Sequence, residues 1–209
     1  KGYVFIMKDK INKIMNEIII PNMMKFVNIK PIVALKDGIL FTLPLLMIGS
    51  IFLLIANFPY APFTEFLSDK GLTGPLAQVN GATFSIIALV AVIGVTYCYV
   101  KNEGYEPMSA GFIAFAVFLI TTNSYATNAD GAIVENVISK EWTSGQGMIT
   151  AIIIGLVVGS IYSWFMKKEI TIKMPEGVPS SVANSFASLI PGAFLITGAL
   201  IIYIFFKNV

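Results

Sequence analysis

Five apolar stretches without a charged side chain set the limits on what this sequence can fold into. A helix needs about 20 mostly apolar residues to cross the hydrocarbon core of a bilayer. Four of the stretches are 19 or 20 residues long and the other has 15. We therefore predict an all-α membrane protein with about five membrane-spanning helices, at residues 39–57, 82–100, 108–122, 147–166 and 188–206.

Composition excludes several classes of function. Hydrophobic residues make up 56% of the chain and charged residues 12%, whereas a soluble domain carries about 25% charged residues. All 14 basic residues are lysines, and a net charge of +2 is too small to indicate a nucleic-acid partner. There is no histidine, and the single Cys98 can form neither an internal disulfide nor a thiol cluster. We expect no metal site, no cofactor and no self-sufficient catalytic centre in this chain.

Polar segments separate the apolar stretches. Prolines and glycines crowd residues 58–82, which we predict to be an extramembrane loop with at most a short interfacial helix near Phe63 to Leu67. Residues 101–107 form a charged turn, so the second and third helices are expected to make a hairpin. Residues 123–146 are rich in Asn, Thr, Asp and Gly, and we predict a loop outside the hydrocarbon.

The lysines predict the orientation, because cytoplasmic segments hold the excess of positive charge. Eleven lysines fall on the side that includes the N-terminus and three on the opposite side. The N-terminus is therefore predicted to be cytoplasmic. We expect the first helix to be an uncleaved anchor, and the sequence ends so soon after the fifth helix that we expect the protein to continue beyond it.

Residues 1–30 are predicted to form a cytoplasmic arm with an amphipathic helix that ends at Pro21. Lysines and Glu17 occupy its polar faces, and its apolar residues recur at helical spacing at Met7, Ile11, Ile14, Met15 and Ile18. Two interpretations stay open. The helix lies on the inner leaflet, or it packs against a partner.

Small residues on the fourth predicted helix indicate a packing face. Gly155, Gly159 and Ser163 repeat every four residues, which lets another helix approach closely. The sequence leaves open whether that helix belongs to the same chain or to a second copy. Aromatic residues near the predicted helix ends are expected to anchor the chain at the membrane interfaces. They are Tyr97, Tyr99, Trp142, Tyr162 and Trp164.

Carboxylates inside a membrane helix would indicate ion or proton coupling. None falls inside the five predicted helices. Lys36 and Asp37 lie at the mouth of the first helix, where neighbouring charges are expected to act as surface anchors. The sequence therefore disfavours an ion-coupled carrier that is complete in this chain.

The connection before the last predicted helix reads IKMPEGVPSSVANSFASLIPG at residues 172–192. Its three prolines and two glycines hold the backbone in extended or turned form directly beside a membrane helix. The segment is either a cytoplasmic linker or a stretch that lines a cavity or docks a partner. It closely resembles the corresponding part of the lactose and cellobiose (diacetylchitobiose) family of phosphotransferase enzyme IIC subunits. A second stretch, ALKDGILFTLPLLMIGS at residues 34–50, is similar to the family's first span.

The resemblance covers nearly the whole chain and implies a carrier built from a pairing half and a substrate half. Such a carrier takes a disaccharide inward while a partner IIB subunit, working with IIA, phosphorylates it from a phosphocysteine. The family's essential His and Glu belong to the substrate half, so no catalytic residue is carried over to this chain. Glu176 and Asn184 match positions of the family stretch and are candidates for lining the sugar path or contacting the other half. Aromatic residues at a pore mouth could also stack on sugar rings.

By this resemblance, residues 31–209 are the N-terminal half of an enzyme IIC transporter in a bacterial inner membrane. The expected substrate is a disaccharide such as cellobiose, lactose or diacetylchitobiose, and the expected role of this half is mainly to pair two protomers as a homodimer within the lipid bilayer. The alternative is a free-standing membrane scaffold that associates without transport. A half-size secondary transporter is the least favoured hypothesis, because the predicted helices hold no ionisable residue.

Overall fold

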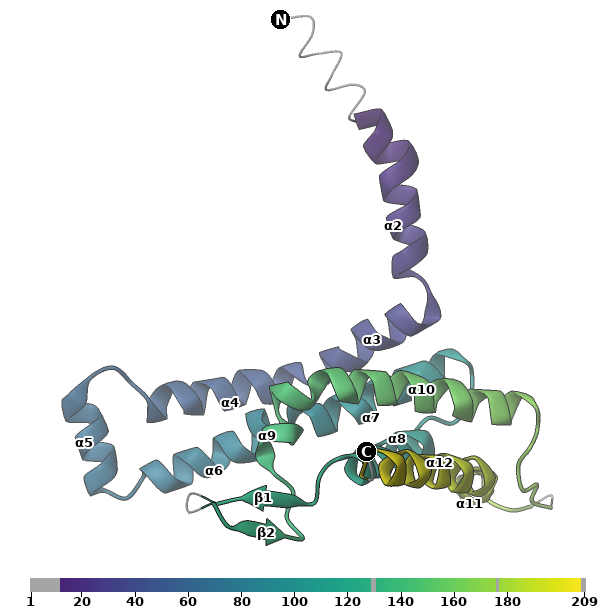
Figure 1. Cartoon of the computed structure of the whole chain (residues 1–209). Coiled ribbons are helices and arrows are strands. Elements are labelled where there is room, and N and C mark those ends of the chain that lie inside the picture. The colour runs from purple at the N-terminus through teal and green to yellow at the C-terminus, as the bar shows by residue number, and fades with distance from the viewer. Residues whose placement is uncertain (1–11, 129–130, 176, 208–209) are drawn as a thin grey trace, which may run out of the picture.

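The computed structural model describes residues 12–128, 131–175 and 177–207. Helices account for most of these residues, and two short strands pair between α8 and α9 (Figure 1). In chain order the elements are η1 (Met15–Ile19), α2 (Ile20–Val27), α3 (Lys30–Leu40), α4 (Leu43–Ala56), α5 (Ala61–Asp69), α6 (Thr73–Thr83), η2 (Phe84–Ile86), α7 (Ile87–Asn102), α8 (Met108–Thr121), β1 (Tyr125–Thr127), β2 (Ile133–Glu135), α9 (Lys140–Thr143), η3 (Gly145–Gly147), α10 (Met148–Lys167), α11 (Ser180–Ala187) and α12 (Leu189–Lys207).

Four continuous helical stretches within the described residues are long and apolar enough to cross a membrane. They combine neighbouring elements into Lys30–Ala56, Thr73–Asn102, Gly145–Lys167 and Ser180–Lys207. The fifth predicted helix is the shorter apolar α8. The predicted all-α membrane fold is confirmed.

Helix α7 lies at the centre of the bundle. Helices α3, α8 and α10 pack around it, and α12 packs on α8 and α10. Helix α7 contributes many fully buried side chains, and they are small: Ala88, Ala91, Val92, Val95 and Val100. Small side chains let neighbouring backbones come close, so van der Waals contact extends along the whole length of α7.

Two glycines set the crossing of α3 and α7. A Cβ atom at Gly38 would lie 2.5 Å from the Cα atom of Val95, and a Cβ atom at Gly94 would lie 2.5 Å from the carbonyl oxygen of Gly38. Both obstacles are backbone atoms, which cannot rotate away as a side chain can. Glycine is therefore required at both positions for the two helices to meet at this distance.

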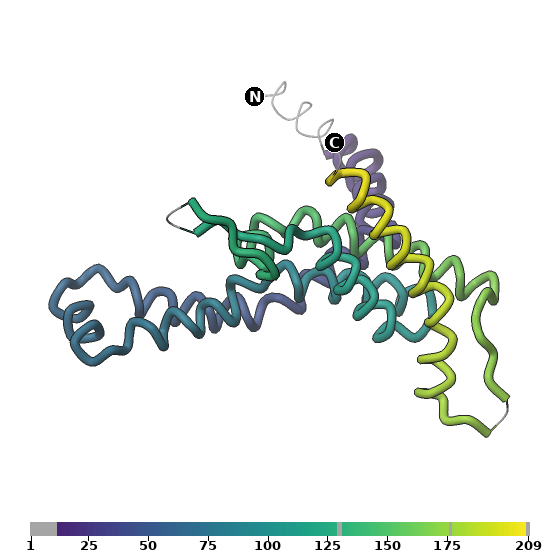
Figure 2. Tube along the Cα trace, turned by 60° about the horizontal axis from the view of Figure 1, so that its bottom comes forward, coloured from purple at the N-terminus to yellow at the C-terminus, as the bar shows by residue number. Residues whose placement is uncertain are grey.

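Helices α5 and α6 occupy most of residues 58–82, so the predicted loop was wrong, although the short helix expected near Phe63 to Leu67 falls within α5. Helices α4 and α6 pack along each other, α5 joins them, and the three form an arm that projects from the bundle (Figures 1 and 2). Pro62 and Pro75 lie in the first turns of α5 and α6, where a backbone N–H has no partner within the helix and its loss costs little. The prolines therefore mark helix starts, and Gly71, with a φ of +64°, makes the turn between the two helices.

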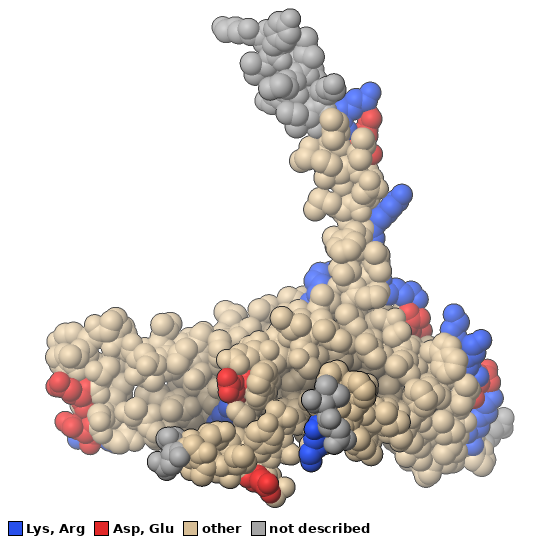
Figure 3. Space-filling view, viewed as in Figure 1, with Lys and Arg blue, Asp and Glu red and all other residues tan. Residues whose placement is uncertain are grey.

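The N-terminal helix continues past Pro21, so the prediction that it ends there was wrong. Pro21 follows the π-helical turn η1, in which the N–H of Ile20 donates to the carbonyl oxygen of Met15. The helix passes the proline through this altered bonding pattern, and the helical stretch runs from Met15 to Val27. It crosses the direction of α3 and α4 (Figure 1), and its charged side chains gather on one side (Figure 3). Met7 and Ile11 lie outside the described residues.

The polar segment between α8 and α10 contains a β-hairpin and a short helix. Strands β1 and β2 pair antiparallel, with Tyr125 opposite Glu135 and Thr127 opposite Ile133. Below the strands, the N–H of Val137 donates to the carbonyl oxygen of Ser124 over 3.2 Å and closes the base of the hairpin. The hairpin lies at the same end of the bundle as the end of α12 (Figure 1).

We predict that replacing Gly94 with Ala destabilises the bundle by about 1–3 kcal/mol, because the added methyl group overpacks the α3 crossing. The control is Gly198→Ala on α12, where a Cβ atom would meet nothing within 4 Å. Thermal unfolding of both variants in detergent micelles gives the comparison. An unchanged unfolding temperature for Gly94→Ala, or an equal loss in the control, would show that the crossing is not tightly packed.

Candidate functional site

The predicted small-residue face of α10 packs against α7 of the same chain. A Cβ atom at Gly155 would lie 3.0 Å from the Cβ atom of Val95, and one at Gly159 would lie 2.9 Å from the Cβ atom of Tyr99. The hydroxyl group of Thr96 adds a polar contact across this interface. It donates to the carbonyl oxygen of Val92 over 2.8 Å and lies 3.1 Å from that of Gly155.

Ser163 continues this face and is buried. Its hydroxyl oxygen and that of the neighbouring Tyr162 are shielded from solvent and make no hydrogen bond within the described residues. The prediction that Tyr162 anchors the membrane interface was wrong, because the side chain lies fully buried in the core among α7, α8, α10 and α12. Trp142 and Trp164 are about half exposed, with 46% and 51% of their surface accessible, as an interfacial position requires.

A break in the second long helix is the most unusual backbone feature. Helix α6 meets α7 through the 3₁₀ turn η2, where Thr83 and Ile86 leave helical geometry with φ angles of −123° and −116°. A carbonyl group freed by such a break needs a partner inside a membrane protein. The hydroxyl group of Thr143, on α9, donates to the carbonyl oxygen of Ser85 over 2.8 Å, and Thr143 is buried.

The other side of the break touches the first long helix. A Cβ atom at Gly49 of α4 would lie 2.4 Å from the hydroxyl oxygen of Thr83. The break is therefore held between α4 and α9, two elements that are far apart along the chain. Sequence reasoning missed it, because neither Thr83 nor Thr143 belongs to a recognisable motif.

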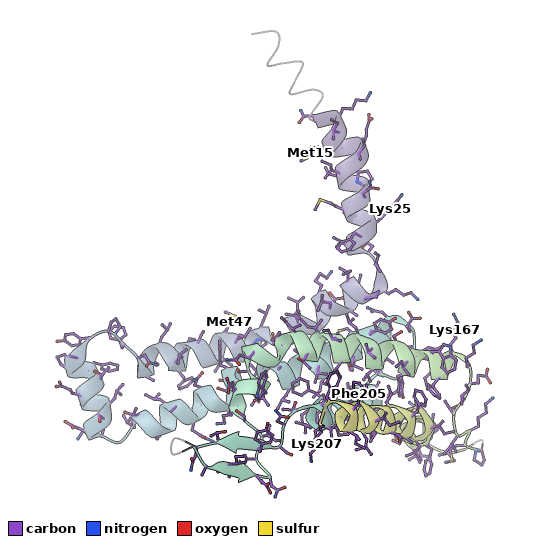
Figure 4. All side chains as sticks on the ribbon, in the orientation of Figure 1. Met15, Lys25, Met47, Lys167, Phe205 and Lys207 are labelled. Carbon is purple, nitrogen blue, oxygen red and sulfur yellow. The ribbon has the colours of Figure 1, made fainter. Side chains whose placement is uncertain are left out.

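Residues 168–175 and 177–179, between α10 and α11, lie at the opposite end of the bundle from the hairpin, beyond Lys167 (Figure 4). The ammonium group of Lys173 donates to the Glu169 carboxylate over 2.5 Å, and this hydrogen bond lowers the pKa of that carboxyl. Asn184 lies half-buried on α11, which packs on α12. Glu176 lies outside the described residues.

Ion pairs gather at the end of the bundle where α3 begins. The ammonium group of Lys30, at the start of α3, lies 2.7 Å from the Glu103 carboxylate at the end of α7. Lys36 and Asp37 approach to 3.4 Å. They lie well inside the long helix that starts at Lys30, not at its mouth, because Pro31 starts this helix earlier than the apolar stretch alone predicts.

The described residues contain no group of three or more His, Cys, Asp or Glu side chains that could hold a metal ion. Three of their polar contacts join distant helical elements, and the charged side chains concentrate at the ends of the molecule (Figure 3). The fold and its contacts define a multi-pass helical membrane protein.

The family follows from comparison with known proteins. The sequence matches the family described as Phosphotransferase system, EIIC, over residues 36–209, and the chain belongs to this family.

Two similar relatives are bacterial. The chain is 35% identical to the lichenan permease IIC component of Bacillus subtilis, over 93% of this chain and 45% of that protein. It is 34% identical to the cellobiose-specific EIIC component of Geobacillus stearothermophilus, over 88% of this chain and 43% of that protein.

A solved structure matches as well. This is the transporter ChbC, the IIC component of the N,N'-diacetylchitobiose-specific phosphotransferase system. It superposes with a TM-score of 0.85 at 32% identity, over 93% of this chain and 47% of that one. The chain therefore spans about half the length of the relatives it matches.

We predict that Thr143→Val destabilises the protein by about 1–3 kcal/mol, because the buried Ser85 carbonyl loses its partner. The control is Thr64→Val on α5, where the lost hydroxyl bond reaches only Ala61 of the same exposed turn. Denaturation followed by near-ultraviolet circular dichroism measures both variants. Equal stability of the two would mean that α9 does not support the break.

Proposed function

We propose that this chain is the N-terminal, pairing half of a sugar-carrying EIIC subunit in a bacterial cytoplasmic membrane. The observation that carries the proposal is the match to ChbC, whose TM-score of 0.85 extends over 93% of this chain but only 47% of the transporter. The relatives are named for cellobiose, lichenan and diacetylchitobiose. The proposed cargo is therefore a disaccharide such as cellobiose, diacetylchitobiose or lactose, which the complete carrier imports and its IIB and IIA partners phosphorylate.

Exposed apolar surface supports the pairing role. Only 11% of the most apolar part of the first long helix is buried within the chain, against 50% for the second. Large side chains on α4 are exposed, since 67% of the surface of Met47 (Figure 4) and 68% of that of Leu54 is accessible. Such a surface needs lipid or protein against it. We assign part of it to a second protomer and the rest to the bilayer.

The polar contacts support a static role for this half. The hydroxyl groups of Thr96 and Thr143 each reach a carbonyl oxygen of another helical element, and the ion pair of Lys30 with Glu103 ties the first long helix to the second. Glu176 and Asn184 remain proposed as residues that line the sugar path or contact the other half. A free-standing scaffold is the second candidate function, and exposed apolar surface is compatible with it.

We predict that the chain alone does not import sugar, because the substrate half is a separate part of the fold. The measurement is accumulation of phosphorylated cellobiose in cells that lack their own cellobiose carrier but contain the soluble phosphotransferase proteins. The complete Geobacillus stearothermophilus relative is the positive control. Accumulation by cells that express only these 209 residues would overturn the assignment.

The oligomeric state of the purified chain tests the pairing role. We expect light scattering in detergent to give a protein mass of twice 22.7 kDa. A monomer at every concentration would contradict the pairing role, while a dimer that binds no substrate half would favour the scaffold.

We predict a cytoplasmic N-terminus, which places the α10–α11 connection inside the cell and the hairpin outside. Single cysteines replace Ser180 and Glu135, both exposed, in a Cys98→Ala background. A membrane-impermeant maleimide should label Glu135→Cys in intact cells and Ser180→Cys only after permeabilisation. The reverse pattern would invert the topology.

A further inference from the structure

A hollow of about 760 Å³ opens between the β-hairpin and the last turns of α12. Pockets for small ligands measure about 300–1,000 Å³ and combine aromatic walls with a few polar groups. Elements far apart in the sequence build this one, since Tyr125 and Glu135 come from the strands and Tyr203 and Phe206 come from α12. Figure 4 shows Lys207 at the end of α12, beside the hairpin.

The hairpin base fixes the polar wall of the hollow. Asn136 follows β2 with a φ of +61°, a conformation that asparagine adopts more readily than most residues. This turn brings Val137 back to Ser124, where the 3.2 Å backbone hydrogen bond forms. Ser124 and Asn136 therefore face the hollow from the two ends of one closed loop.

The aromatic wall of the hollow is exposed within this chain. Tyr125 is 49% exposed and Phe206 is 73% exposed, although both are large and apolar enough to be buried elsewhere. The ammonium group of Lys207 lies 5.9 Å from the centre of the Tyr203 ring, which holds the lysine at the rim. A smaller cavity next to the hollow shares Thr121 and Asn123 with it and adds Trp142.

The chemistry of the lining selects a neutral, hydroxyl-rich ligand. One carboxylate, Glu135, and one ammonium group, Lys207, leave the described lining without a net charge, whereas a phosphate site would gather several cations. Amide and hydroxyl groups can donate to and accept from sugar hydroxyls, and the Glu135 carboxylate can accept from them. Aromatic rings offer flat apolar faces to the C–H face of a pyranose ring.

We propose that this hollow is an oligosaccharide-binding site on the outer face of the carrier, separate from the site at which the substrate half moves the sugar. The inference rests on the proposed sugar-carrying function and on the hairpin lying outside the cell. In this role the hollow holds the incoming sugar near the membrane surface before transport. The adjoining cavity beside Trp142 gives a longer oligosaccharide additional surface to contact.

The test measures binding of cellobiose and cellotetraose to the full 209-residue chain in lipid nanodiscs, by saturation-transfer NMR and calorimetry. Tyr125→Ala and Phe206→Ala each remove an exposed ring, and we expect each to weaken binding about three- to tenfold. Asn136→Gly removes the amide but keeps the left-handed backbone, with a similar expected loss. Tyr60→Ala is the matched control, because this exposed tyrosine directly precedes α5, which lies at the tip of the arm, away from the hairpin (Figure 1).

Weaker binding in the three hollow variants, with the control unchanged and all four chains equally folded by circular dichroism, supports the site. Absence of binding to the unaltered chain at about 10 mM sugar, or equal affinity in all variants, overturns it. The assay needs neither transport nor phosphorylation. Absence of binding in this assay therefore does not contradict the proposed carrier function. Absence of uptake by the complete protein would in turn not change the binding result.

Discussion

Close approach to α7 is the constraint on which the bundle depends. Lipid tails are as apolar as leucine, so burying leucine between two membrane helices gains little, and association relies on backbones that come near enough for dense contact. Gly38 and Gly94 permit this at the α3 crossing, and Gly155 and Gly159 permit it at the α10 crossing. Helices α3 and α10 thus both approach α7 closely, and a single added methyl group at the α3 crossing meets backbone that cannot move aside.

The helical, membrane-spanning character of the chain could be predicted because it depends only on composition along the sequence. The residues at which the helices begin could not be predicted from the sequence. A proline suits both a loop and the first turn of a helix, and Pro62 and Pro75 are of the second kind. Only packing against α4 decides that residues 73–83 continue the second helix, and that packing is a property of the folded arm.

The candidate site likewise has one part that the sequence could predict and another that it could not. The spacing of Gly155 and Gly159 is local, so their shared face was visible in the sequence, although the identity of the facing helix was not. The hydrogen bond from Thr143 to Ser85 joins residues 58 positions apart, and the contact from Thr96 to Gly155 joins residues 59 apart. Contacts between residues so far apart cannot be predicted from a local sequence pattern. The hollow beside the hairpin likewise exists only after α12 returns to the strands.

The length of the second helix has a consequence for the arm. Its 30 residues rise about 1.5 Å each, which makes about 45 Å, while the hydrocarbon core measures about 30 Å. The ion pair of Lys30 with Glu103 joins the two long helices at one end. The surplus then falls at the other end, where α5 carries Glu65 and Asp69, with Lys70 directly after it. A helix longer than the hydrocarbon is thick leaves room for these charges outside it, so the arm can carry polar side chains that a shorter helix would bury in lipid.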